Sequence, residues 1–395
     1  MAGTPEGPVH EAPRAVVLFS GGGTGGHLYP ALALAEALAE ARPDVRAFFV
    51  GARQGVEARI LPARGVDHHL LPVRGLARRE GLANARAVPA LLRSVAEADE
   101  LFRRLRPDLV VVTGGYAGAP AGLVAVLRGV PLVLQEQNSV PGITTRGLAR
   151  WARQIHLAFP EAAQALPRSV RMAVRLSGNP VRPPVAVDRV AARAAFGLDA
   201  HGSVVLVVGG SQGSATLNRI VGEAVAAVGG GEDPPPAGLQ LLWATGPAHL
   251  DAVRSALGAS PPSWVRTVGY IDDMHLALGC SDLAVSRAGA MATAEFLAWG
   301  VPMILVPLPT AAADHQRQNA RALEEAGTAL HLPEAGLSGA ELWHSVMGLV
   351  GDPARLEALR KAARERGRPG SARRIAAALA ELLPSARGPL RGRRP

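Results

Sequence analysis

The sequence has very few cysteines, lysines and aromatic residues. Of its 395 residues, only Cys280 is a cysteine and only Lys361 is a lysine, and aromatic side chains make up 4%. A single cysteine excludes an internal disulfide and fits a reducing compartment. Arg, Gly or Pro interrupts every apolar run before it reaches the roughly 18 residues that a membrane-spanning helix needs, so we expect no such helix.

The net charge of +9 comes almost entirely from arginine. A basic chain suggests a nucleic-acid partner, but the few aromatic residues do not alternate with basic ones, so a stacking platform for single strands is missing. An anionic membrane surface or a phosphorylated substrate fits the charge at least as well. We therefore expect no nucleic-acid partner.

Short apolar segments of strand composition alternate with helix-forming segments in two successive series. Such alternation predicts parallel sheets with helices on both faces. The predicted fold class is therefore α/β, with two doubly wound Rossmann-like domains that face a cleft. The expected parts are a disordered leader (1–13), an N-terminal domain (14–182), a C-terminal domain (183–369), a helix that packs back on the N-terminal domain (370–384) and a basic disordered tail (385–395).

Glycine-rich turns follow several of the predicted strands. They span residues 21–26, 114–120 and 209–214, and residues 287–290, which contain one glycine, form a further turn into a helix. Each turn lies between a strand and a helix, where backbone N–H groups can face an anion or a sugar oxygen without a Cβ in the way. In the second series, Arg287 adds a cationic fork suited to a diphosphate, and Glu295 follows where a carboxylate could accept from ribose hydroxyls.

Two further segments each allow two interpretations. Residues 74–106 mix apolar residues with eight arginines. They form either an amphipathic helix packed on the sheet or a basic, partly apolar surface that rests on acidic lipid headgroups. The polar run Gln135–Asn138 ends a predicted strand, and it is either a loop facing water or a site whose polar groups are paired by a hydroxyl-rich ligand.

Taken together, these motifs resemble the MurG family of N-acetylglucosaminyltransferases. The matching stretches, which occur in the family's order, are GGGTGGHLYPALALA (21–35), GGYAGAP (114–120), EQN (136–138), GNPVR (178–182), GGSQGS with Asn218, IDDM (271–274), RAGAMATAE (287–295) and HQRQNA (315–320). The resemblance implies a GT-B fold in which the C-terminal domain holds most of the donor, UDP-N-acetylglucosamine. It also implies transfer to the undecaprenyl-diphosphate-linked muramyl-pentapeptide, with inversion, without a metal or other cofactor, by a peripheral protein at the cytoplasmic face of the membrane.

The resemblance also implies the donor-binding residues. Those expected on the N-terminal side and at the sugar are Thr24, Gly25, Gly26, Asn138 and Gln316. Those expected near the nucleotide and its diphosphate are Arg182, Ser211, Ile271, Arg287, Ala290, Met291, Ala292, Thr293, Ala294 and Glu295.

His27 is the first candidate for the general base, because imidazole changes charge near neutral pH. Glu136 is the second candidate, either as the base or as the group that orients His27. Many family members have histidine where this chain has Gln135, so acid–base chemistry by that ring is not available here. No Asp-x-Asp pair and no His/Cys cluster at ligand spacing occurs, so we expect no metal site.

Three other functions stay open at this point. A glycosyltransferase for a small aglycone or a UDP-sugar 2-epimerase would keep the architecture, but a soluble substrate gives no reason for the basic segment 74–106. A Rossmann-like nucleotide- or RNA-binding protein would need neither the paired domains nor the polar run at 136–138.

Overall fold

A computed structural model describes residues 15–75, 87–229, 235, 237–258 and 260–385. The chain divides into two compact units. Within the described ranges, unit 1 comprises residues up to 137, residues 141–180 and residues from 371 onward, and unit 2 comprises residues 138–140 and 181–370. The predicted leader (1–13), nearly all of the predicted tail (385–395) and residues 76–86 lie outside the described residues.

Unit 1 is built on a parallel sheet of seven strands in the order β3-β2-β1-β4-β5-β6-β7. The strands are β1 (Ala15–Gly21), β2 (Val45–Ala52), β3 (His68–Leu71), β4 (Leu109–Gly114), β5 (Leu132–Glu136), β6 (Gln154–Leu157) and β7 (Val174–Leu176). Strands β1, β4 and β5 are apolar runs buried on both faces, as parallel strands under two helical layers must be.

Helices cover both faces of this sheet. One apolar cluster joins the sheet to α1 (Gly25–Ala41), α2 (Glu57–Ala63) and α15 (Ser371–Ala380). The other joins it to α4 (Ala87–Leu105), α5 (Ala119–Arg128) and α6 (Ile143–Leu148). The short turns η1 (Tyr116–Gly118), η2 (Ala149–Trp151), η3 (Pro160–Ala165) and η4 (Arg168–Ala173) complete the unit.

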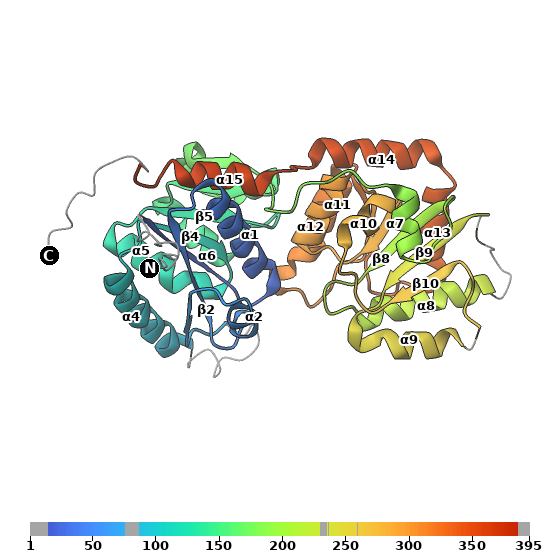
Figure 1. Ribbon diagram of the computed structural model, residues 1–395, viewed down its shortest axis with the longest axis horizontal. Coiled ribbons are helices and arrows are strands. Elements are labelled where there is room, and N and C mark those ends of the chain that lie inside the picture. Colours follow the sequence, from blue (N-terminus) through green and yellow to red (C-terminus); the bar gives the residue numbers. More distant parts are fainter. Residues whose placement is uncertain (1–14, 76–86, 230–234, 236, 259, 386–395) are drawn as a thin grey trace, which may run out of the picture. The chain divides into compact units, whose positions relative to one another are not determined.

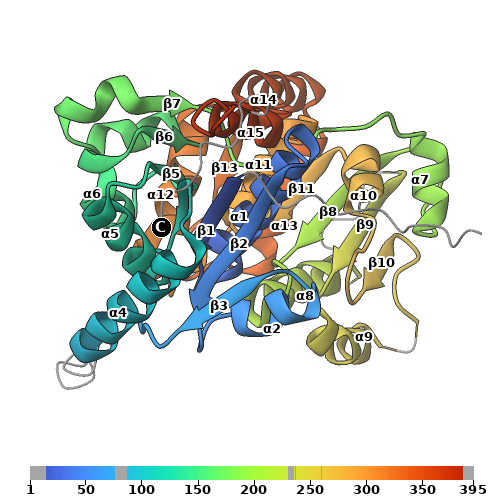
Figure 2. The same cartoon turned by 60° about the vertical axis from the view of Figure 1, so that its left-hand side comes forward.

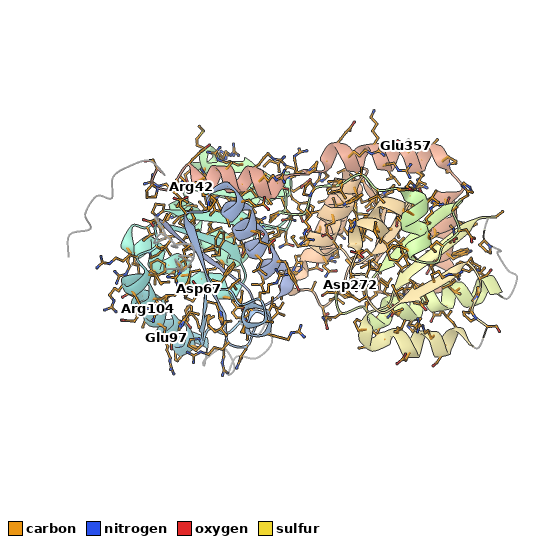
Figure 3. All side chains as sticks on the ribbon, in the orientation of Figure 1. Arg42, Asp67, Glu97, Arg104, Asp272 and Glu357 are labelled. Carbon is orange, nitrogen blue, oxygen red and sulfur yellow. The ribbon has the colours of Figure 1, made fainter. Side chains whose placement is uncertain are left out.

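The C-terminal helix α15 belongs to unit 1, although it follows unit 2 in the sequence. Ile375, Ala376 and Leu379 are fully buried in the same cluster as α1. Figure 1 shows α15 alongside α1, and Figure 3 shows Arg42 at the end of α1 close to α15. Arg42 donates a hydrogen bond of 3.1 Å to the main-chain oxygen of Pro384. The two ends of the described chain are thus packed into one core.

Unit 2 is built on a parallel sheet of six strands in the order β10-β9-β8-β11-β12-β13. The strands are β8 (Ser203–Val208), β9 (Leu239–Ala244), β10 (Val265–Val268), β11 (Leu283–Ser286), β12 (Met303–Leu305) and β13 (Ala329–His331). The helices are α7 (Arg189–Ala195), α8 (Ala215–Gly229), α9 (Leu250–Leu257), α10 (Met274–Cys280), α11 (Ala290–Trp299), α12 (His315–Glu325), α13 (Gly339–Val350) and α14 (Pro353–Arg366). Figure 2 shows β8, β9 and β10 side by side.

Both sheets reverse their strand order at one place. In unit 1 the reversal lies between β1 and β4, and in unit 2 it lies between β8 and β11. Ligands of doubly wound sheets bind at the carboxyl ends of the strands that flank such a reversal. Each of the four strands is followed by a turn that contains glycine, so the sheet topology places the four predicted turns at the two ligand positions. The two doubly wound sheets confirm the predicted fold class.

The basic segment (74–106) is helical over α4 (Ala87–Leu105), and its residues 76–86 lie outside the described residues. Ala98, Leu101 and Phe102 of α4 are buried against the sheet, which confirms the amphipathic helix of the first alternative. Val88 and Leu92 remain exposed, but Arg93 and Arg103 pair with Glu97 and Asp99 on the same helix. Figure 3 shows Glu97 and Arg104 on this helix. No helix in the described part of the chain is long and apolar enough to cross a membrane.

Candidate active-site residues

The first glycine loop of unit 1 runs from the end of β1 to the start of α1. Gly23 has a φ of +90°, a conformation that favours glycine. A Cβ at Gly115, in the loop after β4, would lie 2.1 Å from the main-chain oxygen of Gly22. The two loops therefore pack backbone against backbone. Thr24 precedes α1 without a side-chain cap bond and is exposed, as is Gly26, so both predicted donor contacts are accessible.

The ring of His27 is oriented by two acceptors. Its Nδ1 lies 2.9 Å from Oε1 of Gln137 and 3.1 Å from the main-chain oxygen of Thr113. The Gln137 Nε2 donates to the carbonyls of Thr113 (2.8 Å) and Gln135 (3.1 Å), which fixes the amide with Oε1 toward the imidazole. Because Nδ1 faces only acceptors here, it holds the proton of the neutral ring. Nε2 is left with a lone pair that can take a proton from a hydroxyl.

Gln137 is not among the site residues predicted from the sequence, although it lies within the polar run Gln135–Asn138. Side chains alternate between the two faces along a strand, so Gln135 and Gln137 share a face that Glu136 does not. Glu136 is buried, and its Oε2 accepts from the Thr145 hydroxyl (2.6 Å) and from the Gly142 N–H (3.0 Å). These bonds hold the start of α6. The role of Glu136 as a base stays a prediction.

Gln135 takes part in the same network. Its Nε2 donates to Oδ1 of Asn179 (3.1 Å), and Asn179 donates to the main-chain oxygen of Gln137 (3.2 Å). Both amide side chains are buried. Gln135 and Asn179 therefore fix the backbone that presents Gln137 to His27. The alternation signal could have identified this set, but only β-strand pairing shows that Thr113 and Gln137 lie on neighbouring strand ends.

Asn138 belongs to unit 2, one residue beyond the network just described. Asn319 of α12, fully buried, donates to Oδ1 of Asn138 (3.2 Å) and accepts from the main-chain N–H of Ser139 (2.9 Å). Asn319 also donates to the main-chain oxygen of Ala288 (3.3 Å). The structure thus brings the end of the polar run to the turn before α11. Gln316, one turn earlier on α12, accepts from the Leu308 N–H (3.0 Å).

Arg287 joins the two glycine loops of unit 2. It is 5% exposed, and its Nε and Nη2 donate to Oγ of Ser214 (3.2 and 2.6 Å). Its Nη1 donates to the main-chain oxygen of Val306 (3.0 Å), and Nη2 also forms an ion pair with Glu334. The guanidinium donors are therefore engaged within the protein, and they fix the loop after β8 against the turn after β11. Ser211, in the first of these loops, is exposed.

Helix α11 begins directly after that turn. Its N-cap is Gly289, which has no side chain to cap the helix, and the N–H groups of Met291 and Ala292 in the first turn have no main-chain acceptor within the helix. Thr293 donates through its hydroxyl back to the main-chain oxygen of Gly289 (3.1 Å). The positive end of the helix dipole lies at the same place. A phosphate group fits such a helix start by charge and by hydrogen bonding.

Glu295 lies further along α11, beyond Ala294. Burial raises the pKa of its carboxyl from 4.5 to about 7, and the opposing influence is the charge of Arg182. The structure therefore places two predicted donor residues, Arg182 and Glu295, within electrostatic reach of each other in unit 2. Ile271, the expected uracil contact, is 4% exposed and follows β10.

No group of three His, Cys, Asp or Glu side chains in the described ranges is arranged to hold a metal ion.

Comparison with known proteins identifies the family. The model of the glycosyltransferase family 28 N-terminal domain matches residues 17–157, and that of the family 28 C-terminal domain matches residues 204–375. The chain belongs to glycosyltransferase family 28. Each matched range lies largely in one of the two units, so the family's two domains correspond to the two sheets.

Relatives with an assigned activity match nearly the whole chain. The UDP-N-acetylglucosamine–N-acetylmuramyl-(pentapeptide) pyrophosphoryl-undecaprenol N-acetylglucosamine transferase of Desulfitobacterium hafniense is 37% identical over 91% of this chain and 97% of its own length. The transferase of the same name from Salinibacter ruber is 41% identical over 91% and 95%. The crystal structure of Acinetobacter baumannii MurG has a TM-score of 0.74 at 26% identity and covers 93% of this chain and 99% of its own. The protein therefore has the GT-B fold and is an N-acetylglucosamine transferase of this family.

Proposed function

We propose that the protein transfers N-acetylglucosamine from UDP-N-acetylglucosamine to undecaprenyl-diphosphate-linked N-acetylmuramyl-pentapeptide in peptidoglycan synthesis. The observation that carries this proposal is the 37–41% identity, over nine-tenths of the chain, to transferases of that name. The loops at the two strand-order reversals and the oriented imidazole of His27 fit such a transfer.

The proposed reaction is a single displacement with inversion. The 4-hydroxyl of the muramyl sugar attacks the anomeric carbon of the donor from the face opposite UDP. A C–O bond forms as the bond to the diphosphate oxygen breaks, and UDP leaves with the electron pair. Nε2 of His27 accepts the hydroxyl proton, and Gln137 keeps Nδ1 protonated so that Nε2 is the basic atom.

The proposed donor site lies on unit 2. The helix start at Ala290–Ala292 and the exposed N–H groups around Ser211 stabilise the diphosphate, while Arg287 holds the two loops in register. Glu295 accepts hydrogen bonds from the ribose hydroxyls, and Arg182 lies close enough to influence it. Asn138 and Gln316 contact the sugar, and Thr24, Gly25 and Gly26 contact the donor from unit 1. Dipoles and backbone N–H groups would then stabilise the leaving group without a metal ion.

The proposed place of action is the cytoplasmic face of the membrane, without insertion. A surface on unit 1 supports this beyond α4. Ile143, Trp151 and Met172 are exposed, and Met172 is 98% exposed. The same stretch has exposed arginines that make no ion pair within the described residues. These are Arg146, Arg150, Arg153, Arg168, Arg171 and Arg175. Exposed apolar side chains together with exposed arginines that have no ion pair in the described ranges suit an anionic lipid surface.

The deciding experiment is a transfer assay with UDP-N-acetylglucosamine and the lipid-linked muramyl-pentapeptide. We expect disaccharide product in the presence of a chelator at the same rate as with added Mg²⁺. A small aglycone in place of the lipid acceptor serves as the matched control and should give no product. Product with the aglycone alone would contradict the proposed acceptor, and loss of activity with chelator would contradict the metal-free mechanism.

A further inference from the structure

The carboxylate of Glu57 is fully buried. Glu57 has no role in the proposed reaction. It is the first residue of α2, and its Oε1 accepts from the Ala52 N–H (2.7 Å) at the end of β2. Both of its oxygens also lie 3.0 Å from the main-chain nitrogen of Gly23. No ion pair to Glu57 occurs in the described part of the chain. One buried anion thus fastens the end of β2 to the first glycine loop.

Three glycines leave room for this side chain. A Cβ at Gly22, Gly51 or Gly55 would lie 2.3, 2.4 or 2.3 Å from atoms of Glu57. Such distances are far below van der Waals contact, so any other residue at these positions would displace the carboxylate. The β1–α1 loop, the end of β2 and the turn before α2 therefore form a cradle around Glu57.

The position of the glycine loop at residues 21–26 affects the position of His27. A Cβ at Gly23 would lie 2.4 Å from the Tyr116 ring, and one at Gly115 would lie 2.1 Å from the Gly22 oxygen and 2.9 Å from Cδ2 of His27. Burial and the nearby charge of Glu57 raise the pKa of Tyr116. Gly22 and Gly23 are thus enclosed between Glu57, Tyr116 and the second loop. If they moved, Gly115 and the imidazole against it would have to move as well.

The cradle also changes what the loop can bind. In dinucleotide-binding folds the loop N–H groups face the phosphates of the ligand. Here the N–H of Gly23 is already bonded to Glu57, whose charge would oppose a phosphate at the same place. The N–H of Gly23 is therefore not available to a phosphate of the substrate.

We propose that Glu57 is a positioning residue whose carboxylate fixes the glycine loop at residues 21–26 and, through it, the place of His27 for proton transfer. The inference rests on the proposed role of His27. It assigns Glu57 no contact with substrate.

The test compares Glu57→Ala and Glu57→Gln with Asp108→Asn. Asp108 is a matched control because its Oδ2 accepts the Val16 N–H (2.8 Å) at the opposite end of β1, away from the loop. Removing the carboxylate lets the loop shift, so we expect Glu57→Ala to lower kcat about 10²-fold, with KM for UDP-N-acetylglucosamine within about threefold. Glu57→Gln keeps one acceptor oxygen and should lower kcat about tenfold. Asp108→Asn should change kcat less than twofold.

Hydrogen exchange of a peptide covering residues 21–28, measured without substrate, gives a readout independent of turnover. Exchange should rise in Glu57→Ala and Glu57→Gln but not in Asp108→Asn.

If Glu57→Ala does not fold, Glu57→Gln alone decides. Unchanged kcat and exchange in folded Glu57→Gln would overturn the inference, as would a loss confined to KM or one matched by Asp108→Asn. A wild-type protein that transfers no sugar, while exchange still rises in the variants, would refute the proposed function and the role of His27 but leave the loop-holding role of Glu57.

Discussion

The surroundings of His27 and Glu295 constrain these two side chains in different ways. His27 has an acceptor on each side of Nδ1, so its neutral ring has one preferred tautomer. At Glu295, burial disfavours the charged form of the carboxyl, and the positive charge of Arg182 favours it. A buried carboxyl with a raised pKa, such as that of Glu295, is typical of a functional site. Single substitutions of His27 and of Glu295 therefore test their roles.

Replacement of the proposed base should reduce turnover without weakening donor binding. We expect His27→Ala to lower kcat roughly 10²–10⁴-fold, the usual contribution of a general base, with KM for UDP-N-acetylglucosamine nearly unchanged. His68→Ala is the control, because His68 is also half-buried and its Nδ1 also meets a main-chain oxygen, that of Val66 (2.8 Å). Steady-state kinetics with the lipid acceptor would check both. Wild-type turnover in His27→Ala would remove His27 from the mechanism.

Donor affinity should depend on pH through Glu295. Its carboxyl pKa is raised to about 7, so the group is mostly protonated at pH 6 and mostly ionised at pH 8. If only the carboxylate accepts from both ribose hydroxyls, affinity for UDP-N-acetylglucosamine should rise roughly tenfold from pH 6 to pH 8. Calorimetry at three pH values would measure this. Glu295→Gln should bind more weakly and show a flat profile.

The same raised pKa fixes the sign of a stability effect. An acid whose folded pKa lies above its unfolded value favours the folded state at low pH, and that contribution is lost as pH rises from about 4.5 through about 7. Glu295→Gln should therefore raise the unfolding temperature at pH 8 more than at pH 5. An equal shift at both pH values would mean that the carboxyl is not perturbed in the folded protein.

At the level of elements, the proposed lipid-facing surface of unit 1 lies on the short helical elements α6, η2 and η4, which follow β5 in the sequence. The turns η2 and η4 contact each other, and η2 contacts α6. Exposed Trp151 and Met172 lie on these turns, and each directly follows an arginine, Arg150 or Arg171, that makes no ion pair within the described residues. On α4, by contrast, Arg93 and Arg103 are balanced by acidic residues one turn away. We therefore place the proposed lipid-facing surface on α6, η2 and η4, while lipid contact by residues 74–106, of which 76–86 lie outside the described residues, stays a prediction.

This surface can be tested with vesicles that contain acidic lipids. Each arginine near such a surface contributes about 1 kcal/mol, so Arg150→Glu with Arg171→Glu should release the protein from the vesicles. Arg93→Glu with Arg103→Glu makes the same change in net charge on α4 and should have a smaller effect. Co-sedimentation at low and high salt would measure both. Equal release by the two pairs would show that net charge alone governs binding.

At the scale of the whole molecule, the chain builds two sheets and then returns to the first. The return depends on α15, whose apolar face completes the core next to α1. The His156 ring of β6 is buried and hydrogen-bonded to Ser177 and Gln154. Burial lowers the pKa of His156 to about 4. Gln154 donates in turn to the Ala378 oxygen of α15 (3.3 Å). A buried polar network thus joins the last helix to the edge of the sheet.

The sequence predicted the strands with long apolar runs, such as β4 and β8, and the glycine loops that follow them. It did not predict β6 and β7, because Gln154 and His156 are polar residues that become acceptable in a strand only when Ser177 and α15 satisfy them. Helix α10 begins at Met274 after the N-cap Asp273, which makes no side-chain cap bond, so no capping side chain marks this boundary. Boundaries of this kind depend on the final backbone path, which local composition does not contain.

For the site, the sequence by itself determined the chemistry that is available: an imidazole at a glycine turn, a polar run at a strand end, and helix starts suited to a diphosphate. Only the tertiary structure decided which of these groups act on one another. It paired His27 with Gln137 and turned Glu136 toward α6, and it engaged Arg287 internally and placed Glu57 under the glycine loop. The reason is physical, because these partners come from different strands and meet only where parallel strands end at a common edge of the sheet.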